Sequence, residues 1–599
     1  MRPRPLIHAA LPALVFAVSA IWLVARVELD PGARGFHVDE AHKIAEARFF
    51  YLFFVEGDFG HPAWRADFFA RTNPPVGKYL FGAVLAASGH PVRDGDLQDA
   101  FMRHWRRPEA LRAEVPDAQL RVVRTTSALC AALVVLLVFT GARAAGGSGA
   151  GLVAAALLLG NGLFLDAARL GMTDTLLLAT LALVVPVTLR AWRSLARPRE
   201  AAVFAVGVPG LAIALAAGVK LNGALSGLVF GASLILLAAS ARTAVRRRST
   251  LGALAAVGLA GALSLVLFVA MNPFLWHAPV ASLWNVWIAY GDWMRGLQID
   301  PGFPLLGLEQ RALTALHSGF QSPRLLAVRG LGGAGTFLLA SGFVCGLLAL
   351  AAHAVRGARG GGSDGRGAAG TVLLVWALFL LAGMSLWAPL DWDRYALPPY
   401  LGLAAVTGVG LAAAAGRLAG AVRQRSLPYG PAGAAALATC LAAGVAAVLL
   451  PGTTGRALLT PVREAGPPEQ YRAALARRPG EPLLWRHLGL AQLRARRPGE
   501  AASSFEAALR RLPPAAAGEA GAERVLGAIL SWDLALAQAR AGQPELARRA
   551  LAEHAAILAE LRDGARSQDP YVRERFDRIA SERTAWLESA QALPAAAHP

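Results

Sequence analysis

Two adjacent acids, Asp39 and Glu40, lie between His37 and His42 in the stretch GFHVDEAHKIAEA, residues 35–47. The stretch follows the first apolar segment of the chain. A carboxylate at a membrane surface can act as general base for an incoming hydroxyl if a cleft aligns it or raises its pKa. The same residues could instead be solvated loop acids, and the histidines would allow a metal site. We take Asp39 and Glu40 as catalytic candidates and assign no metal.

Lysine is scarce in this chain. Of the 59 basic residues, only Lys43, Lys78 and Lys220 are lysines. A chain that otherwise uses arginine keeps lysine by chance or where a compact ammonium is needed instead of a planar guanidinium. Lys220 lies in GVKLNG, residues 218–223, a connection of a few residues between two apolar runs. It suits a phosphate at headgroup level, or it extends to water beside the membrane.

Other polar residues stand where apolar runs begin or end, and we take them as candidates for binding a phosphate or sugar. They are Lys78 in RTNPPVGKYLFG, Arg169 and Asp174 in DAARLGMTDTLL, and Arg394 and Tyr395 in PLDWDRYALPPY. Ion pairs of purely structural value, such as Arg169 with Asp166, would also explain these charges. Anion recognition by arginine is the more specific interpretation.

Four tryptophans occur in PFLWHAPVASLWNVWIAYGDW, residues 273–293: Trp276, Trp284, Trp287 and Trp293. Tryptophan is enriched at membrane–water interfaces, so an aromatic belt explains this stretch. A platform on which a sugar or acceptor stacks is the alternative.

The composition predicts a polytopic α-helical membrane protein. The chain has 599 residues, 55% of them hydrophobic, and a mean hydropathy of +0.44. Apolar runs of about 20 residues recur, long enough to cross ~30 Å of hydrocarbon. Cys130, Cys345 and Cys440 all lie in apolar runs and show no disulfide or metal spacing. The net charge of +19 does not indicate nucleic-acid binding, because the arginines are spread over loops and tail.

About eleven spans are expected, and a further apolar run, 76–89, is read as a helix beside the bundle. The predicted spans are 6–26, 122–141, 150–166, 171–189, 201–218, 221–240, 251–271, 331–352, 370–388, 396–415 and 433–451.

Arginine-rich loops after the fourth, sixth, eighth and tenth predicted spans set the expected orientation. With the N-terminus inside, all four loops are cytoplasmic, as the positive-inside rule requires. Loop 27–121, the turns at Arg169 and Lys220, and the turn 390–400 are then extracytoplasmic. We read the first segment as a retained signal anchor. The expected location is a bacterial-type inner (plasma) membrane, with the candidate site outside.

The motifs resemble, in their order, those of protein O-mannosyltransferases. The matching segments are DEAH at 39–42, NPPVGKYLFG at 73–82, ARLGMTDTLL at 168–177 and KLNG at 220–223. The RYALPPY turn looks more like the bacterial branch that includes the lipid A aminoarabinose transferases. The resemblance covers roughly residues 1–450 and implies the C-type glycosyltransferase fold.

The resemblance implies a sugar donor on a polyprenyl phosphate and no cofactor. Asp39 becomes the candidate base with Glu40 beside it, and Arg169, Lys220 and Arg394 become candidates for the lipid phosphate. The usual His-Pro-Pro of the family is Asn73-Pro74-Pro75 here, and 272–328 is too short for the β-rich domain of the eukaryotic enzymes. The acceptor is therefore a lipid, a glycan or a protein, and the sugar is mannose-like or another hexose or pentose.

Composition changes after about residue 455 to a polar, helical tail. Trp485, Leu488, Gly489, Ala501, Phe505, Ala508 and Pro513 follow the spacing of a tetratricopeptide repeat. A plain helical hairpin domain is the alternative. We therefore expect a transmembrane glycosyltransferase domain at 1–455 and an extracytoplasmic repeat domain at 456–599 that holds an acceptor or a protein partner.

These observations predict an all-α membrane enzyme that transfers a sugar with inversion and without a metal. A cationic site can stabilise a leaving phosphate, and a base aligned opposite it favours a single displacement. The alternatives are a transporter or flippase of lipid-linked sugars, or a membrane anchor for the repeat domain. A transporter is expected to show paired half-repeats with broken helices, and the sequence shows no such symmetry.

Overall fold

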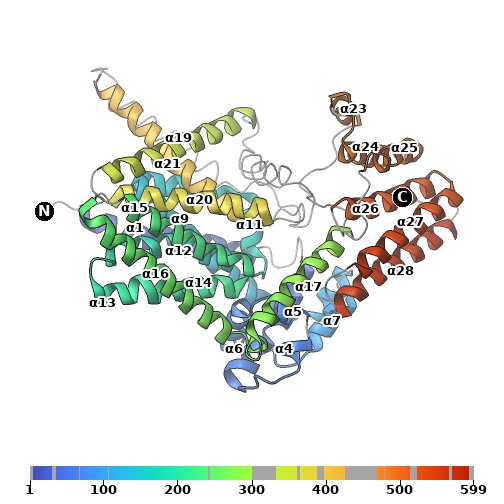
Figure 1. Ribbon diagram of the computed structural model, residues 1–599, viewed down its shortest axis with the longest axis horizontal. Helices are drawn as coiled ribbons and strands as arrows, with labels where there is room; N and C mark the ends of the chain where they lie inside the picture. Colours follow the sequence, from blue (N-terminus) through green and yellow to red (C-terminus); the bar gives the residue numbers. More distant parts are fainter. Residues whose placement is uncertain are drawn as a thin grey trace. The chain divides into compact units, whose positions relative to one another are not determined.

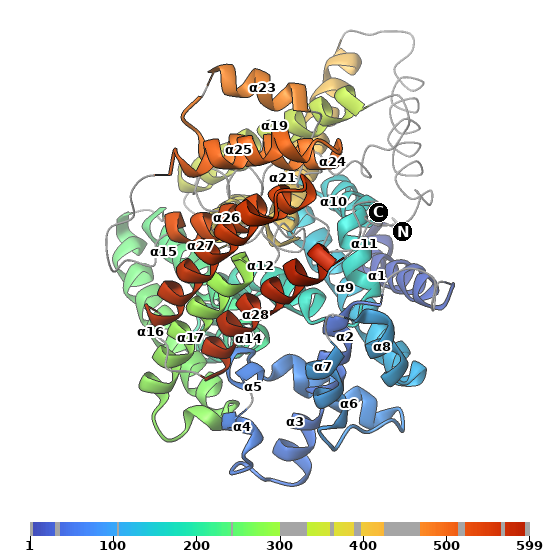
Figure 2. The ribbon, with the colours of Figure 1, turned by 90° about the vertical axis from the view of Figure 1, so that its right-hand side faces the viewer.

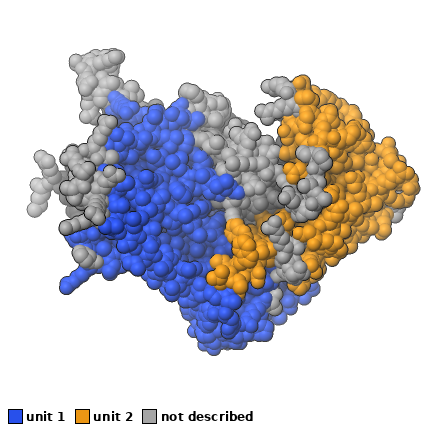
Figure 3. Space-filling model, viewed as in Figure 1, with its two compact units in different colours: residues 1–279, 311–387, 392–460 blue, residues 280–310, 388–391, 461–599 orange. Residues whose placement is uncertain are grey.

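The computed structural model describes twelve segments of the chain: residues 4–29, 36–66, 68–104, 107–240, 243–299, 332–359, 365–387, 397–424, 468–477, 479–512, 522–564 and 570–592. Every regular element in these segments is a helix. The chain forms two compact units (Figure 3). Unit 1 comprises residues 1–279, 311–387 and 392–460, and unit 2 comprises residues 280–310, 388–391 and 461–599.

Unit 1 contains the apolar helices, which confirms the prediction of an all-helical polytopic bundle. Within the described residues, eight helical segments are long and apolar enough to cross a membrane, or nine if one bent pair counts as a span. The elements that form them are α1 (Arg4–Leu29), α9 (Asp117–Gly146), α12 (Asp174–Ser194), α13, η2 and α14 (Pro198–Ala201, Ala202–Gly207 and Val208–Val219), η3 and α15 (Leu221–Ala224 and Leu225–Ser240), α16 (Thr243–Ala270), α20 (Gly365–Trp387) and α21 (Leu397–Gln424), while α10 (Ser148–Gly160) and α11 (Gly162–Arg169) form the bent pair.

The count of eleven spans stays a prediction. The run 433–451 lies outside the described residues. The expected span 331–352 falls on α19 (Gly332–Arg359), of which Ala340–Arg356 forms a shorter apolar stretch. The ambiguous run 76–89 forms α6 (Val76–Ala87), whose 12 residues extend only about 18 Å and do not cross the hydrocarbon core.

The expected span 150–166 falls on two helices, α10 and α11, between which the chain bends by 69°, so this span stays a prediction. Asn161 separates the two helices in an extended conformation, and its side chain accepts a hydrogen bond from the Phe164 amide at 2.8 Å. An asparagine N-cap starts a new helix rather than continuing the old one. The flanking Gly160 and Gly162 lower the helix propensity at this point. The bend fixes where α11 carries Asp166 and Arg169.

The bundle is held together by close helix packing and by buried hydrogen bonds. Helix α9 packs against α1, α10 and α12, and α19 packs against α21 (Figure 1). At Gly346 an added Cβ would lie 2.0 Å from the Val406 carbonyl oxygen, so α19 and α21 approach at glycine. The Trp376 indole donates to the Leu181 carbonyl, and the Tyr400 hydroxyl donates to the Leu157 carbonyl, each at 2.9 Å. These bonds join α20 to α12 and α21 to α10.

The first long loop folds into short helices at one end of unit 1 (Figure 2). They are α2 (Val38–Ala45), α3 (Arg48–Phe50), η1 (Tyr51–Val55), α4 (Ala63–Ala66), α5 (Phe68–Thr72), α6, α7 (Asp96–His104) and α8 (Pro108–Glu114). Ala41, Ile44, Phe81, Leu85 and Leu111 form the centre of a separate small core. This core fixes α2, which carries Asp39.

Unit 2 is built from helix pairs. Its helices are α17 (Pro279–Ile299), α23 (Pro468–Arg477), α24 (Pro482–Arg494), α25 (Pro498–Leu509), α26 (Ala522–Arg540), α27 (Pro544–Asp563) and α28 (Pro570–Ala592). The predicted repeat positions from Trp485 to Ala508 fall on α24 and α25, and Pro513 lies outside the described residues. The Phe505 ring packs against Gly489, where a Cβ would lie 2.6 Å from it. The tetratricopeptide assignment stays a prediction.

Candidate active site

Asp39 lies in the first turn of α2, and its neighbours fix that turn. His37 is the N-cap: its Nδ1 accepts from the Asp39 amide at 3.0 Å, and its own amide donates to Glu40 Oε2 at 3.0 Å. This reciprocal arrangement is a capping box with histidine in place of serine or threonine. The Asp39 side chain keeps 29% of its surface exposed and lies 3.7 Å from His37 Nδ1. The acid is thus oriented by the helix start while remaining accessible.

Glu40 is fully buried and joins three parts of unit 1. Its two carboxylate oxygens accept from Nε and Nη2 of Arg124 on α9, both at 2.8 Å. Oε1 also accepts from the Gly171 amide at 2.7 Å, in the turn before α12. With the His37 amide, four donors occupy this carboxylate. The predicted catalytic role of Glu40 stays a prediction, and the contacts of Glu40 suit a residue that positions Asp39.

Lys220 and Asp174 form an ion pair at the ends of two apolar helices. The Lys220 Nζ lies 2.7 Å from Asp174 Oδ1. Asp174 is the first residue of α12, where a negative charge complements the helix dipole, and Lys220 is the C-cap of α14. The Lys220 side chain is 30% exposed and that of Asp174 is 12% exposed. The ammonium therefore has both a carboxylate partner and access to a ligand.

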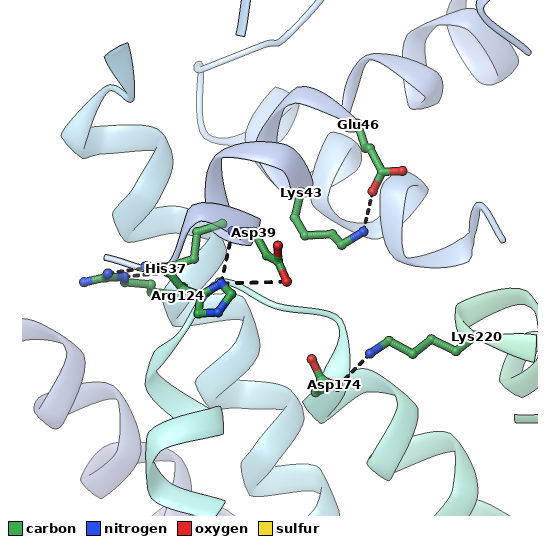
Figure 4. Close-up of polar contacts among 9 residues, drawn as sticks. His37, Asp39, Lys43, Glu46, Arg124, Asp174 and Lys220 are labelled. Carbon is green, nitrogen blue, oxygen red and sulfur yellow. Dashed lines mark hydrogen bonds and ion pairs between the residues drawn. The ribbon is translucent and has the colours of Figure 1, made fainter. Parts of the chain in front are cut away.

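Arg169 ends α11 and lies close to this pair along the chain. Its Nη2 is 3.1 Å from Asp166 Oδ1, one turn earlier on the same helix. The turn that follows carries Gly171, which Glu40 binds, and then leads into Asp174. The contacts of Glu40 thus bring α2 to the segment between Arg169 and Asp174. Figure 4 shows the Asp39 carboxylate on the side of α2 that faces the Asp174–Lys220 pair.

Lys78, predicted to bind the donor, occupies a buried ion-pair network. Its side chain is 2% exposed, and its Nζ lies 2.9 Å from Glu46 Oε1 and 3.2 Å from the carbonyl oxygens of Phe69 and Ala70. The Nζ also lies 4.9 Å from the centre of the Phe49 ring. A donor-binding role for Lys78 stays a prediction, since the contacts described for Lys78 are with other residues of the protein.

Glu46 is the centre of that network. Lys43 Nζ lies 2.5 Å from Glu46 Oε2, and His42 Nε2 lies 3.4 Å from the same oxygen. Burial alone would raise the pKa of the Glu46 carboxyl. The charges of His42, Lys43 and Lys78 and the Lys43 hydrogen bond outweigh burial and lower the pKa to about 2. The network locks α2 to α6.

Glu40 and His42, both in the DEAH stretch, have different partners. Glu40 pairs with Arg124, while His42 Nδ1 lies 3.1 Å from Gln98 Oε1. Of the other predicted site residues, Arg394 and Tyr395 lie outside the described residues. The sequence did not single out Arg124 or Glu46. Arg124 could have been found as a charge within the first turns of a predicted span. Glu46 could have been found from its position four residues after His42.

Comparisons with known proteins agree with the resemblance inferred from the motifs. Residues 51–280 match the family model of dolichyl-phosphate-mannose-protein mannosyltransferases, which confirms that resemblance over this segment. The segment includes Lys78, Arg169, Asp174 and Lys220, and Asp39 and Glu40 precede it. A search of curated proteins gives no match.

Two solved structures are compared with this chain. The oligosaccharyltransferase AglB from Archaeoglobus fulgidus, in complex with an inhibitory peptide and a dolichol-phosphate, is 17% identical, with a TM-score of 0.42 over 75% of this chain and 57% of that chain. ArnT from Cupriavidus metallidurans, bound to undecaprenyl phosphate, is 16% identical, with a TM-score of 0.39 over 96% of this chain and 79% of that chain. The chain thus spans little more than half the length of AglB.

Proposed function

We propose that the protein is an integral membrane glycosyltransferase that moves a sugar from a polyprenyl phosphate to an extracytoplasmic hydroxyl. The observation that carries the proposal is the contact of Glu40 with Gly171. It fixes Asp39 beside the segment that bears Arg169 and Asp174, and Asp174 holds Lys220. The family match over residues 51–280 supports the same reaction class and the C-type fold.

In this proposal, Asp39 accepts the proton of the acceptor hydroxyl. The hydroxyl oxygen attacks C1 of the sugar, the bond from C1 to the phosphate oxygen breaks, and the electron pair stays on the phosphate. A single displacement inverts C1, as in inverting sugar hydrolysis. The proton ends on Asp39 and then passes to water.

The cations supply the other half of the chemistry. The leaving phosphate gains negative charge as the C1–O bond breaks, and we assign Lys220 and Arg169 to stabilise it. Preorganised cations in a site that excludes water stabilise such charge at little reorganisation cost. Asp174 holds Lys220 in position and complements its charge while no donor is bound. Arg394 and Tyr395, which lie outside the described residues, stay predicted members of the donor site.

The decisive experiment is release of free polyprenyl phosphate from a labelled polyprenyl-phosphate sugar by the purified protein. Pentose, hexose and aminosugar donors are tested in parallel, each with and without cell-envelope lipids as acceptors. Release with any donor that depends on an acceptor supports the transferase. A protein that moves the donor across a vesicle membrane without cleaving it is a flippase, and one that does neither is an anchor for unit 2.

The location and partners are part of the same proposal. We place the site and unit 2 on the extracytoplasmic face of a bacterial-type inner membrane, because the arginine-rich loops then lie inside. Helical repeats present extended concave surfaces, so a protein or the acceptor is the proposed ligand of the tetratricopeptide-like domain.

A further inference from the structure

One face of α17 leaves large apolar side chains uncovered. Val280 is 82% exposed, Trp284 62% and Trp287 52%. At 100° per residue, these three positions fall within an arc of about 60° on the helix. Single exposed hydrophobic residues are ordinary, but two tryptophans and a valine on one stripe mark an interaction surface.

The other side of α17 is fixed to unit 2, so the helix cannot turn this stripe inward. Val286, Ala289 and Met294 are buried. Arg583 on α28 donates from Nη2 to the Ile299 carbonyl at 2.8 Å, at the negative end of the α17 dipole. Arg575, also on α28, lies 5.8 Å from the centre of the Trp293 ring.

The Arg583 side chain is itself held in place. Its Nη1 lies 2.9 Å from His554 Nε2, and the His554 Nδ1 lies 2.8 Å from the Ala528 carbonyl oxygen. Burial, together with the charge of Arg583, lowers the pKa of His554 to about 3. The histidine therefore stays neutral and accepts from the arginine throughout the physiological range. The attachment of α17 to α28 is thus part of the unit 2 core.

The chain leads into α17 directly from a membrane span. Helix α16 has a mean hydropathy of 2.4 over Thr250–Ala270, with 22% of its most apolar window buried inside the protein, so most of that window is left to lipid. Trp276 Nε1 donates to the Val269 carbonyl at 3.0 Å, which ties the connecting segment to the end of α16. Pro279 follows three residues later, so the start of α17 lies within about 10 Å of Trp276. The uncovered stripe therefore begins at the membrane–water boundary.

The composition of the stripe selects its ligand. No charged residue occurs from Pro279 to Tyr290. Tryptophan places an apolar ring and a polar N–H where lipid headgroups meet acyl chains. A protein partner or a sugar acceptor would be met by a rim rich in polar and charged groups, and this half of α17 has no charged side chain.

We propose that α17 is an interfacial helix that inserts Val280, Trp284 and Trp287 into the headgroup layer and tethers unit 2 to the membrane surface. The lipid contact is made by the stripe, and the protein contact by Arg575 and Arg583. This inference goes beyond the proposed transferase reaction and does not depend on it.

The test measures where the stripe lies in the full-length protein. Cys130, Cys345 and Cys440 are replaced by serine, and single cysteines are introduced as Val280→Cys, Trp284→Cys and Trp287→Cys. Leu546→Cys on α27 is the control, because Leu546 is apolar, 42% exposed and in the same unit. Each is spin-labelled in nanodiscs of phosphatidylcholine and phosphatidylglycerol, and collisions with oxygen and with a water-soluble nickel chelate are compared.

We expect the three α17 labels to collide at least several-fold more with oxygen than with the nickel chelate, relative to the Leu546 label. Equal behaviour at all four sites would overturn the proposal. So would protection of the α17 labels from both reagents, because a protein would then cover the stripe. Val280→Cys keeps both tryptophans, so a folding defect from their loss cannot decide the outcome.

The tether is tested separately through α28. A donor dye at Leu546 is paired with an acceptor dye on lipid headgroups, and energy transfer is measured in the Arg575→Met, Arg583→Met double variant. We expect transfer to fall well below wild type, because unit 2 loses its hold on α17. Arg548→Met, whose side chain is 55% exposed on α27, is the control and should leave transfer unchanged. Unchanged transfer in the double variant would overturn the tether.

Discussion

At the scale of single residues, Asp39 and Glu40 are neighbours in sequence with different surroundings. Adjacent positions on a helix point about 100° apart, so one faces the core while the other faces outward. Glu40 is buried among four donors, and Asp39 keeps 29% of its side chain exposed. A base that meets an incoming hydroxyl must be reachable, and only the first acid of this pair is.

Asp39→Asn should therefore abolish most transfer while donor binding is retained. The amide cannot accept the proton of the hydroxyl, and loss of a general base costs typically 100- to 10,000-fold in rate. Turnover and donor affinity are measured together on purified protein. Asp94→Asn, at an exposed position of the same loop, is the matched control and should be silent. Near-normal turnover of the Asp39 variant would remove this residue from the mechanism.

Glu40→Gln separates a positioning residue from a catalytic one. Breaking a buried ion pair by removing one charge costs about 3–5 kcal/mol, so the variant should unfold at a clearly lower temperature. Arg124→Met should be destabilised similarly, and the double variant should be less destabilised than the sum of the two. A Glu40→Gln protein with normal stability and no turnover would instead favour the catalytic role that the sequence predicted for Glu40.

Lys220→Ala should weaken donor binding and slow transfer, because the same ammonium would hold the phosphate and meet its growing charge. Lys220→Arg should restore only part of both, since a guanidinium is wider and prefers two acceptors. Arg103→Ala, an exposed cation of the first loop, is the control. Donor affinity and turnover are compared at equal membrane insertion. If Lys220→Arg equals wild type, the compact charge is not required.

Scarcity of lysine could not distinguish Lys220 from Lys78. Both stand at the edge of an apolar run, and both pair with a carboxylate. Their exposure separates them, 30% against 2%, and this depends on helices from other parts of the chain. Arg124 and Glu46 were missed for the same reason, because their partners are chosen by tertiary packing.

At the scale of elements, the sequence predicted apolar helices well and their interruptions poorly. Length and hydropathy suffice for α9, α12 and α16, because any span needs about 20 apolar residues. The bend at Asn161 was missed, since apolar residues continue on both sides of Gly160-Asn161-Gly162 and hide the break in a hydropathy average. The short helices of the first loop are set by their separate core.

The lock between α2 and α6 should depend on pH through Glu46. Its folded pKa of about 2 lies below the ordinary value of 4.5, so the stabilisation is present above pH 4.5 and is lost as pH falls towards 2. The shift corresponds to roughly 3 kcal/mol. Thermal unfolding in detergent should show Glu46→Gln well below wild type at pH 6, with the difference shrinking between pH 4.5 and pH 2.

The control for this lock is Glu114→Gln, an exposed acid of the first loop. Its unfolding temperature should match wild type at every pH. A constant gap between Glu46→Gln and wild type from pH 6 to pH 2 would contradict the assignment, because the gap would then come from packing and not from charge.

At the scale of the whole molecule, contacts between loops constrain how unit 1 crosses the membrane. Glu40 in the first loop binds Gly171, so the segment before α9 and the segment after α11 lie on one side of unit 1. If α9 crosses once, we expect the bent pair to cross as well. Helix α12 begins at Asp174 and α14 ends just before Lys220, so their ion pair puts the start of α12 and the end of α14 on one side. After two further helices, α15 and α16, the Met271 carbonyl accepts from the Tyr79 hydroxyl of the first loop at 2.8 Å.

We then expect the connections that follow α12 and α15 on the opposite side from the first loop, and they correspond to residues 190–200 and 241–250 of the sequence. These connections carry Arg190, Arg193, Arg197, Arg199, Arg242, Arg246, Arg247 and Arg248. The positive-inside rule predicts that they are cytoplasmic, and we therefore expect Asp39, Arg169 and Lys220 on the outside. The loop contacts group these segments on one side, and the charge rule alone predicts which side that is.

We expect single cysteines to report this orientation in intact cells that express a variant without Cys130, Cys345 and Cys440. Asp58→Cys in the first loop and Arg548→Cys in unit 2 should react with a membrane-impermeant maleimide from outside. Arg197→Cys, whose native side chain is 73% exposed, should react only after permeabilisation. Reaction of Asp58→Cys and Arg197→Cys from the same side would mean that α9, the bent pair and α12 make an even number of crossings. The bent pair would then be re-entrant, and the contact of Glu40 with Gly171 could not form, so the proposed site would fall with the topology.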